Sequence, residues 1–412
     1  MPGLLETAGR ANLWVFERRL RLEAARKLAR LTARSLRVHG ASPAWVARRL
    51  VELRRRDYLG WPYLVDEIGL LGLLDPKVPE QRLLDCVSMA RLRPLQLRLS
   101  PPPLSRVIDD KALFYTVCSL AGLPVPETHA FVYRREAGWT RDGRTPLGRA
   151  QWAGAFDRLI EGEVVAKPAL GDMGDGVRGF RREGDRFFEG ERAIGDAGEL
   201  YDSLFADRRY GGFVIQERVR NHEAIAALSG SRTVQTTRVV TLIERPGEEA
   251  AILFATLKVA GGIVDTVVDN IHSGAHGNGV APIDVATGRV GTLLLPLPNG
   301  RGSLDVDTHP RTGRAIRGFE LPLWEETLDL ARRAAACLGM LRTIGWDIAI
   351  TPDGPVLLEG NSGWGAPSSL MPVPPIEQRL RDAVRREDEV PEPAAELEES
   401  LLLGVRDASA RG

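Results

Sequence analysis

Residues 345–361 read GWDIAITPDGPVLLEGN, two short apolar runs separated by Pro352-Asp353-Gly354. Such a separator between runs of alternating residues is typical of a β-hairpin. Successive side chains of a strand point to opposite faces, so Asp347 lies on the face away from the isoleucines that follow it. In the second run, Glu359 and Asn361 share a face. A three-residue turn would place Glu359 opposite Asp347.

This hairpin predicts a metal site. Carboxylate and amide oxygens are the hard ligands that magnesium prefers, with phosphates completing its shell. The candidate ligands are Asp347, Glu359 and Asn361. The alternative is a solvent-facing polar row on an edge hairpin. The glycine-rich run 361–365 makes an unusual plain strand end and favours the metal site.

A second candidate is the glycine-rich segment 171–176, which follows the expected strand around Lys167. Glycines let backbone N–H groups approach phosphate oxygens closely, and Lys167 would add a point charge. The glycines concerned are Gly171, Gly174 and Gly176. No Gly-Lys-Ser/Thr follows, which excludes a P-loop, and a strand follows where a dinucleotide-binding motif has a helix. An ordinary hairpin turn is the alternative.

The expected strand 213–219 is apolar and ends abruptly in polar residues. Such an end can offer backbone groups to a purine edge and a carboxylate to ribose hydroxyls. This interpretation selects Gln216, Glu217 and Val219. The alternative is a strand that exposes its last residues.

Two cations stand inside apolar strands. Arg238 and Lys258 would be costly there unless each meets a partner or an anionic ligand. A polar segment follows at 267–274, where His272 could act as a base or as a hydrogen-bonding loop residue. No nucleophile elbow, Cys/His pair or zinc spacing is found in the sequence, so the pattern indicates phosphate and metal chemistry without a covalent enzyme intermediate.

Composition limits the class of protein. The 412 residues suffice for two or three lobes, and 55 basic residues balance 55 acidic ones, so no overall field attracts nucleic acid. The three cysteines lack metal spacing. The start lacks a signal-peptide pattern, and no apolar run approaches the roughly 20 residues of a membrane span. We expect a cytoplasmic protein.

The two ends differ from the middle. Residues 1–95 are expected to be helical, and an apolar stripe from Phe16 to Leu31 is flanked by arginines. This helix could touch an anionic membrane or a partner, or could simply pack on the main body. Residues 376–412 are acidic and lack a pattern, which predicts a disordered tail.

In their order along the chain, these segments resemble the ATP-grasp superfamily, and most closely the sugar-transfer-associated ATP-grasp family. The resemblance spans about 100–370 and rests on Asp110-Lys111, Val165-Ala166-Lys167-Pro168 with the glycine loop, Ile215-Gln216-Glu217, Thr237-Arg238-Val239-Val240, Val268-Asp269-Asn270, Asp347 and Glu359-Gly360-Asn361. It implies an α/β (α+β) ATP-grasp fold with a helical N-terminal extension. The expected parts are the extension (1–95), a small lobe (96–150), a lid subdomain (151–222), a large lobe with the metal site (223–375) and the tail (376–412).

The resemblance also implies roles for the candidate residues. Lys111, Lys167 and the glycine loop would contact the phosphates of ATP, and Gln216, Glu217 and Val219 the adenosine. One or two Mg2+ ions would bind at the hairpin. Catalysis would use Arg238 and Lys258, and the substrate acid would lie near Asp269, Asn270 and His272. Two acids in the loop, Asp172 and Asp175, depart from the expected pattern because they would repel a triphosphate.

The implied activity is that of a carboxylate–amine ligase acting through an acyl phosphate, on small-molecule or peptide substrates. A phosphotransferase and a non-catalytic ATP-binding scaffold are the alternatives. The sequence does not indicate an oligomeric state.

Overall fold

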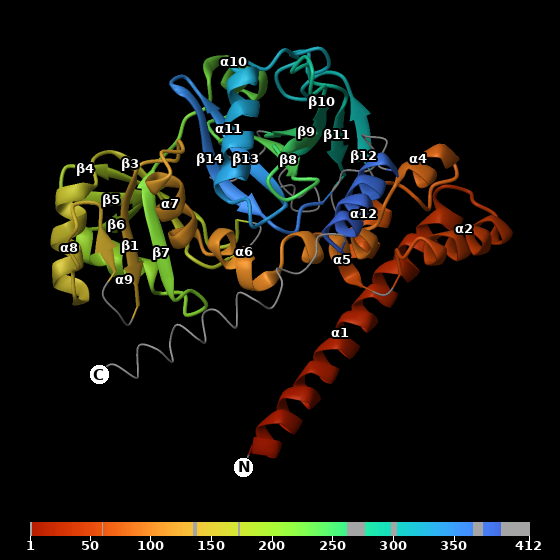
Figure 1. Ribbon diagram of the computed structural model, residues 1–412, viewed down its shortest axis with the longest axis horizontal. Coiled ribbons are helices and arrows are strands. Elements are labelled where there is room, and N and C mark those ends of the chain that lie inside the picture. Colours follow the sequence, from red (N-terminus) through yellow and green to blue (C-terminus); the bar gives the residue numbers. More distant parts are fainter. Residues whose placement is uncertain are drawn as a thin grey trace, which may run out of the picture.

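The computed structural model describes residues 2–59, 61–134, 138–171, 174–261, 277–297, 303–365 and 374–388. Its strands form two antiparallel sheets from consecutive parts of the chain (Figure 1). We call the first one the lid sheet. Its strand order is β2 (Trp139–Thr140), β1 (Thr128–Tyr133), β7 (Gly212–Glu217), β3 (Glu163–Pro168), β4 (Arg178–Glu183), β5 (Arg186–Glu189) and β6 (Arg192–Gly195). The lid sheet thus includes β1 and β2, so it crosses the boundary expected at residue 150.

The second sheet, which we call the large sheet, follows in the chain. Its order is β12 (Ser303–Val306), β11 (Leu293–Pro296), β10 (Gly279–Ile283), β9 (Ala251–Val259), β8 (Thr236–Leu242), β13 (Thr343–Thr351) and β14 (Gly354–Asn361). β13 lies between β8 and β14, and all nine of its residues are buried. β14 is an edge strand.

Each sheet carries helices on one face. The helices α8 (Gly148–Leu159) and α9 (Ala197–Leu204) cover the lid sheet through a core that includes Trp152, Phe156 and Phe187. On the large sheet, α11 (Trp324–Cys337) packs on β13, and Ile225 and Leu228 of α10 (Glu223–Ser229) belong to the same core as Trp346 and Ile348. Burial of these apolar side chains is the main force that holds each layer together.

The opposite face of the large sheet is divided in two. At one end, Val240, Leu242, Phe254 and Trp364 pack against α5 (Met89–Leu99) and α12 (Pro374–Asp388). At the other end, the residues on this face are charged. Since strand side chains alternate between faces, Arg238, Lys258 and Asp347 lie on the same side as this second core. The charged half faces the lid sheet.

The helix α12 corrects the prediction of a disordered tail over 376–388. Leu380 is fully buried, and Glu244 accepts hydrogen bonds from Arg379 and Arg386. The acidic composition concealed an amphipathic helix with its apolar stripe at Ile376, Leu380 and Ala383. The remaining tail residues, 389–412, lie outside the described residues.

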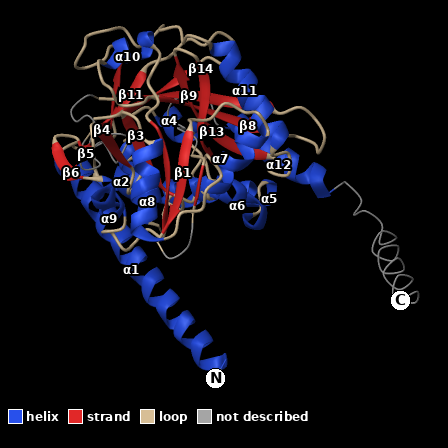
Figure 2. Ribbon diagram, turned by 90° about the vertical axis from the view of Figure 1, so that its left-hand side faces the viewer, coloured by secondary structure: helices blue, strands red, loops and turns tan. Residues whose placement is uncertain are grey.

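The extension is helical, as expected, with α1 (Pro2–Arg37), α2 (Pro43–Arg55), α3 (Pro62–Leu70) and α4 (Glu80–Asp85). Figures 1 and 2 both show the first half of α1 running away from the body. In its second half, Leu28 and Leu31 pack on the core of the extension, and Lys27 pairs with Asp66 of α3 at 2.7 Å. This part of the predicted stripe is therefore a packing face. None of the described helices is both long and apolar enough to cross a membrane.

The helix that begins at Lys111 joins the sheets. After α6 (Pro102–Asp109), Asp110 caps α7 (Lys111–Leu120) by accepting from the backbone N–H groups of Ala112 and Leu113. The Lys111 N–H of α7 donates to the carbonyl of Ala169, beyond β3. Past the other end of the helix, the carbonyl of Pro124 accepts from Leu357 of β14. Thus α7 is bonded to both sheets.

Asp347 pairs with Glu359, as predicted, but a shorter turn and a β-bulge produce this register in place of a three-residue turn. The turn contains two residues, Pro352 and Asp353, because Thr351 already pairs with Gly354. A β-bulge follows: Ile348 pairs with Leu357, whereas Asp347 pairs with Glu359. Leu358 is the extra residue. In a regular strand, Leu357 and Glu359 are two residues apart and would both lie on the core face. The bulge at Leu358 breaks this alternation and turns Glu359 to the charged face.

The position of α12 gives a stability prediction. Leu380→Ala should lower the free energy of unfolding by about 2–5 kcal/mol, because it removes apolar contacts and leaves a cavity between α12 and the large sheet. Urea denaturation measures this change. Gln378→Ala, at an exposed position of the same helix, is the control. Equal stability of Leu380→Ala and wild type would mean that α12 does not pack on the sheet.

Candidate active site

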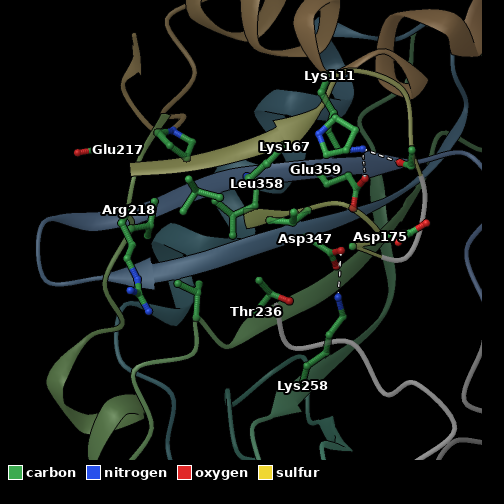
Figure 3. Close-up of a pocket in the computed structure, with 18 residues that line it drawn as sticks. Lys111, Lys167, Asp175, Glu217, Arg218, Thr236, Lys258, Asp347, Leu358 and Glu359 are labelled. Carbon is green, nitrogen blue, oxygen red and sulfur yellow. Dashed lines mark hydrogen bonds and ion pairs between the residues drawn. The ribbon is translucent and has the colours of Figure 1, made fainter. Parts of the chain in front are cut away.

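A cleft between the lid sheet and the charged half of the large sheet holds most of the predicted site residues. Its volume is about 880 Å³, including its open mouth. The walls come from α7, β3 and the glycine loop, the end of β7, and the strands β8, β9, β13 and β14 (Figure 3). Its lining residues are Lys111, Pro126, Val165, Lys167, Pro168, Gly171, Gly174, Asp175, Val177, Glu217, Arg218, Val219, Val234, Thr236, Lys258, Asp347, Leu358 and Glu359.

Asp347 is held by two cations. Arg238 donates from Nε to Oδ1 at 2.5 Å and from Nη2 to Oδ2 at 2.8 Å, and Lys258 donates from Nζ to Oδ2 at 3.1 Å. Asp347 is only 5% exposed. Burial alone would raise the pKa of Asp347, but the charges of Arg238 and Lys258 outweigh it and hold that pKa well below its usual range. The carboxylate therefore stays ionised, and the three groups together carry a net positive charge.

Lys111 links the glycine loop to the hairpin. Its Nζ donates to the carbonyl of Gly171 at 2.8 Å and lies 3.0 Å from Oε1 of Glu359. Lys111 is buried, whereas Glu359 is partly exposed to the cleft. A long cation that reaches both the loop and a hairpin carboxylate lies where a bound anion could compete for it.

Lys167 also projects from the lid sheet into the cleft. Its Nζ donates to the hydroxyl of Tyr115 at 2.9 Å and lies 5.3 Å from the centre of the tyrosine ring. Burial lowers the pKa of Lys167 to about 8, although the charge of Glu359 acts in the opposite direction. Unlike an ordinary lysine, this residue loses its charge within a physiologically accessible pH range.

The structure resolves the difficulty with one acid of the loop. Asp175 lines the cleft, and its Oδ2 lies 2.7 Å from Nη1 of Arg209. Arg209, which lies outside the glycine loop, therefore offsets the charge of Asp175. Gly176 has φ +75°, and a Cβ there would come within 2.4 Å of the ring of Tyr210, so this glycine is required by both conformation and space. Asp172 lies outside the described residues.

The end of β7 forms the wall at the other end of the cleft. Glu217, Arg218 and Val219 line it. The carboxylate of Glu217, however, accepts from the Glu127 N–H at 2.9 Å and points away from the pocket in Figure 3. Gln216 is fully buried, and its Nε2 donates to Thr128 at 2.9 Å. The side chains of Glu217 and Gln216 are thus both bonded to the segment 127–128.

Other predicted residues lie apart from the lining. Asn361 is opposite Gly345, and its Nδ2 lies 3.4 Å from the Gly345 carbonyl. Asp269, Asn270 and His272 fall in 262–276, outside the described residues. Their predicted roles, like that of Asn361, stay predictions.

The residues that sequence reasoning missed include three polar side chains, Tyr115, Arg218 and Thr236. Arg218 and Thr236 line the cleft, and Tyr115 bonds to a lysine that does. A signal existed for Tyr115, because it follows Lys111 by four residues on one helix and so shares its face. Arg218 and Thr236 stand near strand ends with nothing in the local sequence to select them.

The donor set at the hairpin fits magnesium. Asp347 and Glu359 pair across β13 and β14, and both face the cleft. Mg2+ is commonly held by one or two carboxylates together with phosphate oxygens. Among the described residues, no cluster of three or more His, Cys, Asp or Glu could form a complete metal site of protein ligands alone. Two neighbouring carboxylates, with Lys111, Lys167 and Lys258 in the same cleft to meet phosphate oxygens, match the first arrangement.

Two antiparallel sheets with this cleft between them are the ATP-grasp fold, with helices preceding it. Within that fold, residues 91–379, more than half of the chain, match the family model for sugar-transfer associated ATP-grasp. The chain belongs to this family. A comparison with curated protein sequences gives no match.

Solved structures of similar fold are distant. The ATP-grasp ligase PsnB, in complex with a precursor variant, Mg and ADP, is 16% identical with a TM-score of 0.35, covering 69% of this chain and 60% of its own. The L-amino acid ligase from Bacillus licheniformis is 11% identical with a TM-score of 0.32, and the match covers 63% of this chain and 41% of the ligase. The VanG D-Ala:D-Ser ligase from Enterococcus faecalis is 13% identical with a TM-score of 0.40, and the match covers 69% of this chain and 62% of the ligase. The match thus spans less than two thirds of each of these chains, and similarity this low indicates no reaction for this protein.

The buried cluster at Asp347 gives a second prediction. Asp347→Asn should lower the free energy of unfolding by about 3–5 kcal/mol, because Arg238 and Lys258 would remain as neighbouring cations without a counter-charge. Denaturant unfolding followed by circular dichroism measures the change.

The control is Asp142→Asn, which removes a carboxylate from an exposed pair with Arg158 and should have a much smaller effect. If both variants lost the same stability, the ion cluster would not contribute as described.

Proposed function

We propose that this protein is an ATP- and Mg2+-dependent carboxylate–amine ligase. The observation that supports it best is the convergence of three lysines and two in-register carboxylates on one cleft between two sheets. The lysines are Lys111, Lys167 and Lys258, and Arg238, which is not one of the lining residues, pairs with the lining carboxylate Asp347. Membership of the ATP-grasp family supports the same assignment.

In this proposal the nucleotide spans the cleft. Its adenine lies against the backbone at Glu217–Val219 and beside Val165 and Leu358, and its phosphates lie toward the glycine loop. Lys111 and Lys167 contact phosphate oxygens, and Gly174 lets backbone N–H groups come close. Where Mg2+ is bound, Asp347 and Glu359 would hold it, with Asn361 as the further predicted ligand, and the ion would offset phosphate charge.

The reaction proceeds in two steps. A carboxylate oxygen of the acid attacks the γ-phosphorus, the bond from that phosphorus to the bridging oxygen breaks, and ADP leaves. An amine then attacks the acyl phosphate, loses a proton, and displaces inorganic phosphate to leave an amide. Arg238 and Lys258 stabilise the charge spread over the transferring group, so positioning and electrostatics supply the catalysis.

The substrate classes in this proposal are an amino acid, a peptide or a sugar-linked acid, with a small-molecule or peptide amine. The sugar-linked option rests on the family description alone. We place the reaction in the cytoplasm, where ATP and Mg2+ are available.

A hydroxylamine trap tests the proposal. The enzyme is incubated with Mg-ATP, hydroxylamine and pooled amino acids, short peptides and uronic acids, and products are read by mass spectrometry. A hydroxamate formed together with ADP is expected, since hydroxylamine intercepts an acyl phosphate. ADP accompanied by a stable phosphorylated product would instead indicate a phosphotransferase, and binding without turnover would indicate a scaffold.

In the same assay, Glu359→Ala should reduce ADP formation to background while the fold is retained, because a hairpin carboxylate is lost. Glu183→Ala, at an exposed position of β4, is the control and should turn over normally. Normal turnover by Glu359→Ala would contradict the metal assignment.

Lys167 gives a pH prediction. Its pKa of about 8 lies below that of an ordinary lysine, so its positive charge is present at pH 7 and is lost as the pH rises through 8. Affinity for ADP in the presence of Mg2+ should therefore fall above pH 8, by up to about tenfold per pH unit. Isothermal titration calorimetry from pH 6.5 to 9.5 measures it.

Lys167→Arg keeps its charge over this range, so its affinity should stay level across the same titration. A matching decline in Lys167→Arg would assign the pH dependence to another group.

A further inference from the structure

Tyr115 belongs to no predicted set, yet its hydroxyl lies where three elements meet. The hydroxyl donates to the carbonyl of Leu358 in β14 at 2.5 Å and accepts from Nζ of Lys167 in β3 at 2.9 Å. The side chain comes from α7 and is 1% exposed. A phenol has one proton to donate, so the donation to Leu358 fixes the oxygen lone pairs toward Lys167.

The bond to Leu358 has a special consequence, because Leu358 is the extra residue of the β-bulge. No residue of β13 pairs with it, and the bulge is what turns Glu359 from the core face to the cleft. Tyr115 therefore anchors the one irregularity on which the orientation of Glu359 depends.

The bond to Lys167 acts on the opposite wall. Lys167 is the lid-sheet cation that projects into the cleft, and the ring of Tyr115 lies under its ammonium. Burial, followed by the charge of Glu359, raises the pKa of Tyr115 well above its usual range, so the hydroxyl remains protonated and keeps donating to Leu358.

Tyr115 acts beside Lys111, one helical turn earlier on the same face of α7. Lys111 likewise contacts both sides, with Gly171 on the lid and Glu359 on the hairpin. Each of the two side chains thus makes one contact on the lid side and one with β14. The capped start of α7 fixes their direction.

We propose that Tyr115 is a positioning residue, whose hydroxyl sets the distance between the lid cation Lys167 and the hairpin carboxylate Glu359. This inference rests on the proposed function, since those two residues are there assigned to phosphate and metal. The role differs from that of a buried core tyrosine, because deletion of one oxygen should disturb Lys167 specifically and leave the packing intact.

The test combines two measurements on Tyr115→Phe, which keeps the ring and removes only the hydroxyl. The matched control is Tyr201→Phe, on α9, where the ring packs edge-on against Phe205. Far-UV circular dichroism and urea unfolding first establish that both variants fold.

The first measurement needs no substrate. The chain has only five lysines, so trace acetylation with acetic anhydride and mass spectrometry can follow each one separately. In Tyr115→Phe, Lys167 should react about fivefold faster than in wild type, as expected for one lost hydrogen bond. Lys258, held by Asp347, should be unchanged and serves as the internal reference. An unchanged Lys167 rate would overturn the proposal.

The second measurement is ADP formation. Tyr115→Phe should lower kcat by about tenfold or more with a smaller change in KM for ATP, because misplacement affects the transition state more than the bound substrate. Turnover equal to wild type would overturn the positioning role even if Lys167 becomes more reactive.

The outcomes separate the two proposals. If wild type forms no ADP with any acid, the ligase proposal fails, and affinity for ADP with Mg2+ then decides on Tyr115. A loss of about tenfold in Tyr115→Phe, absent in Tyr201→Phe, supports positioning, and equal affinity refutes it. Loss of folding in Tyr115→Phe would also refute it, because the ring packing would then depend on the hydroxyl.

Discussion

Asp347 is almost fully buried and still charged, and a buried carboxylate remains ionised only where cations meet it. Arg238 of β8 and Lys258 of β9 fill that need from neighbouring strands of the same sheet face. Because these side chains cannot be covered by an apolar core, the large sheet stays uncovered at this end. The cleft lies over this uncovered end, and the lid sheet forms its opposite wall.

The remaining charges are arranged across the gap. The lid contributes Lys167 and the glycine loop, and the hairpin contributes Glu359. The helix α7, bonded to both sheets, holds the two walls at a fixed separation through Lys111 and Tyr115. Each hairpin carboxylate is paired with a lysine, Asp347 with Lys258 and Glu359 with Lys111. Under the proposed function, a phosphate group and a metal ion that bind together exchange these partners without leaving a buried charge unpaired.

Several features could be predicted from local sequence alone. The hairpin around Asp353 and the strands carrying Lys167 and Arg238 depend on residues close together in the chain. The prediction failed where composition masked periodicity, as in α12, whose charged residues conceal an apolar stripe. It was also wrong about the turn at Pro352 and Asp353, since a single-residue bulge compensated for the shorter loop.

Local sequence was sufficient to predict the strands around the cleft and most of the charged residues that form it, because strand alternation and cation placement are local properties. Which charges meet depends on tertiary packing. It paired Asp347 with two cations, directed Asp175 to Arg209, turned Glu217 outward, and brought Tyr115 between Lys167 and Leu358. The physical reason is that a buried charge or hydroxyl is satisfied by whichever partner the packing of sheets and helices brings within about 3 Å, and that partner is usually distant in sequence.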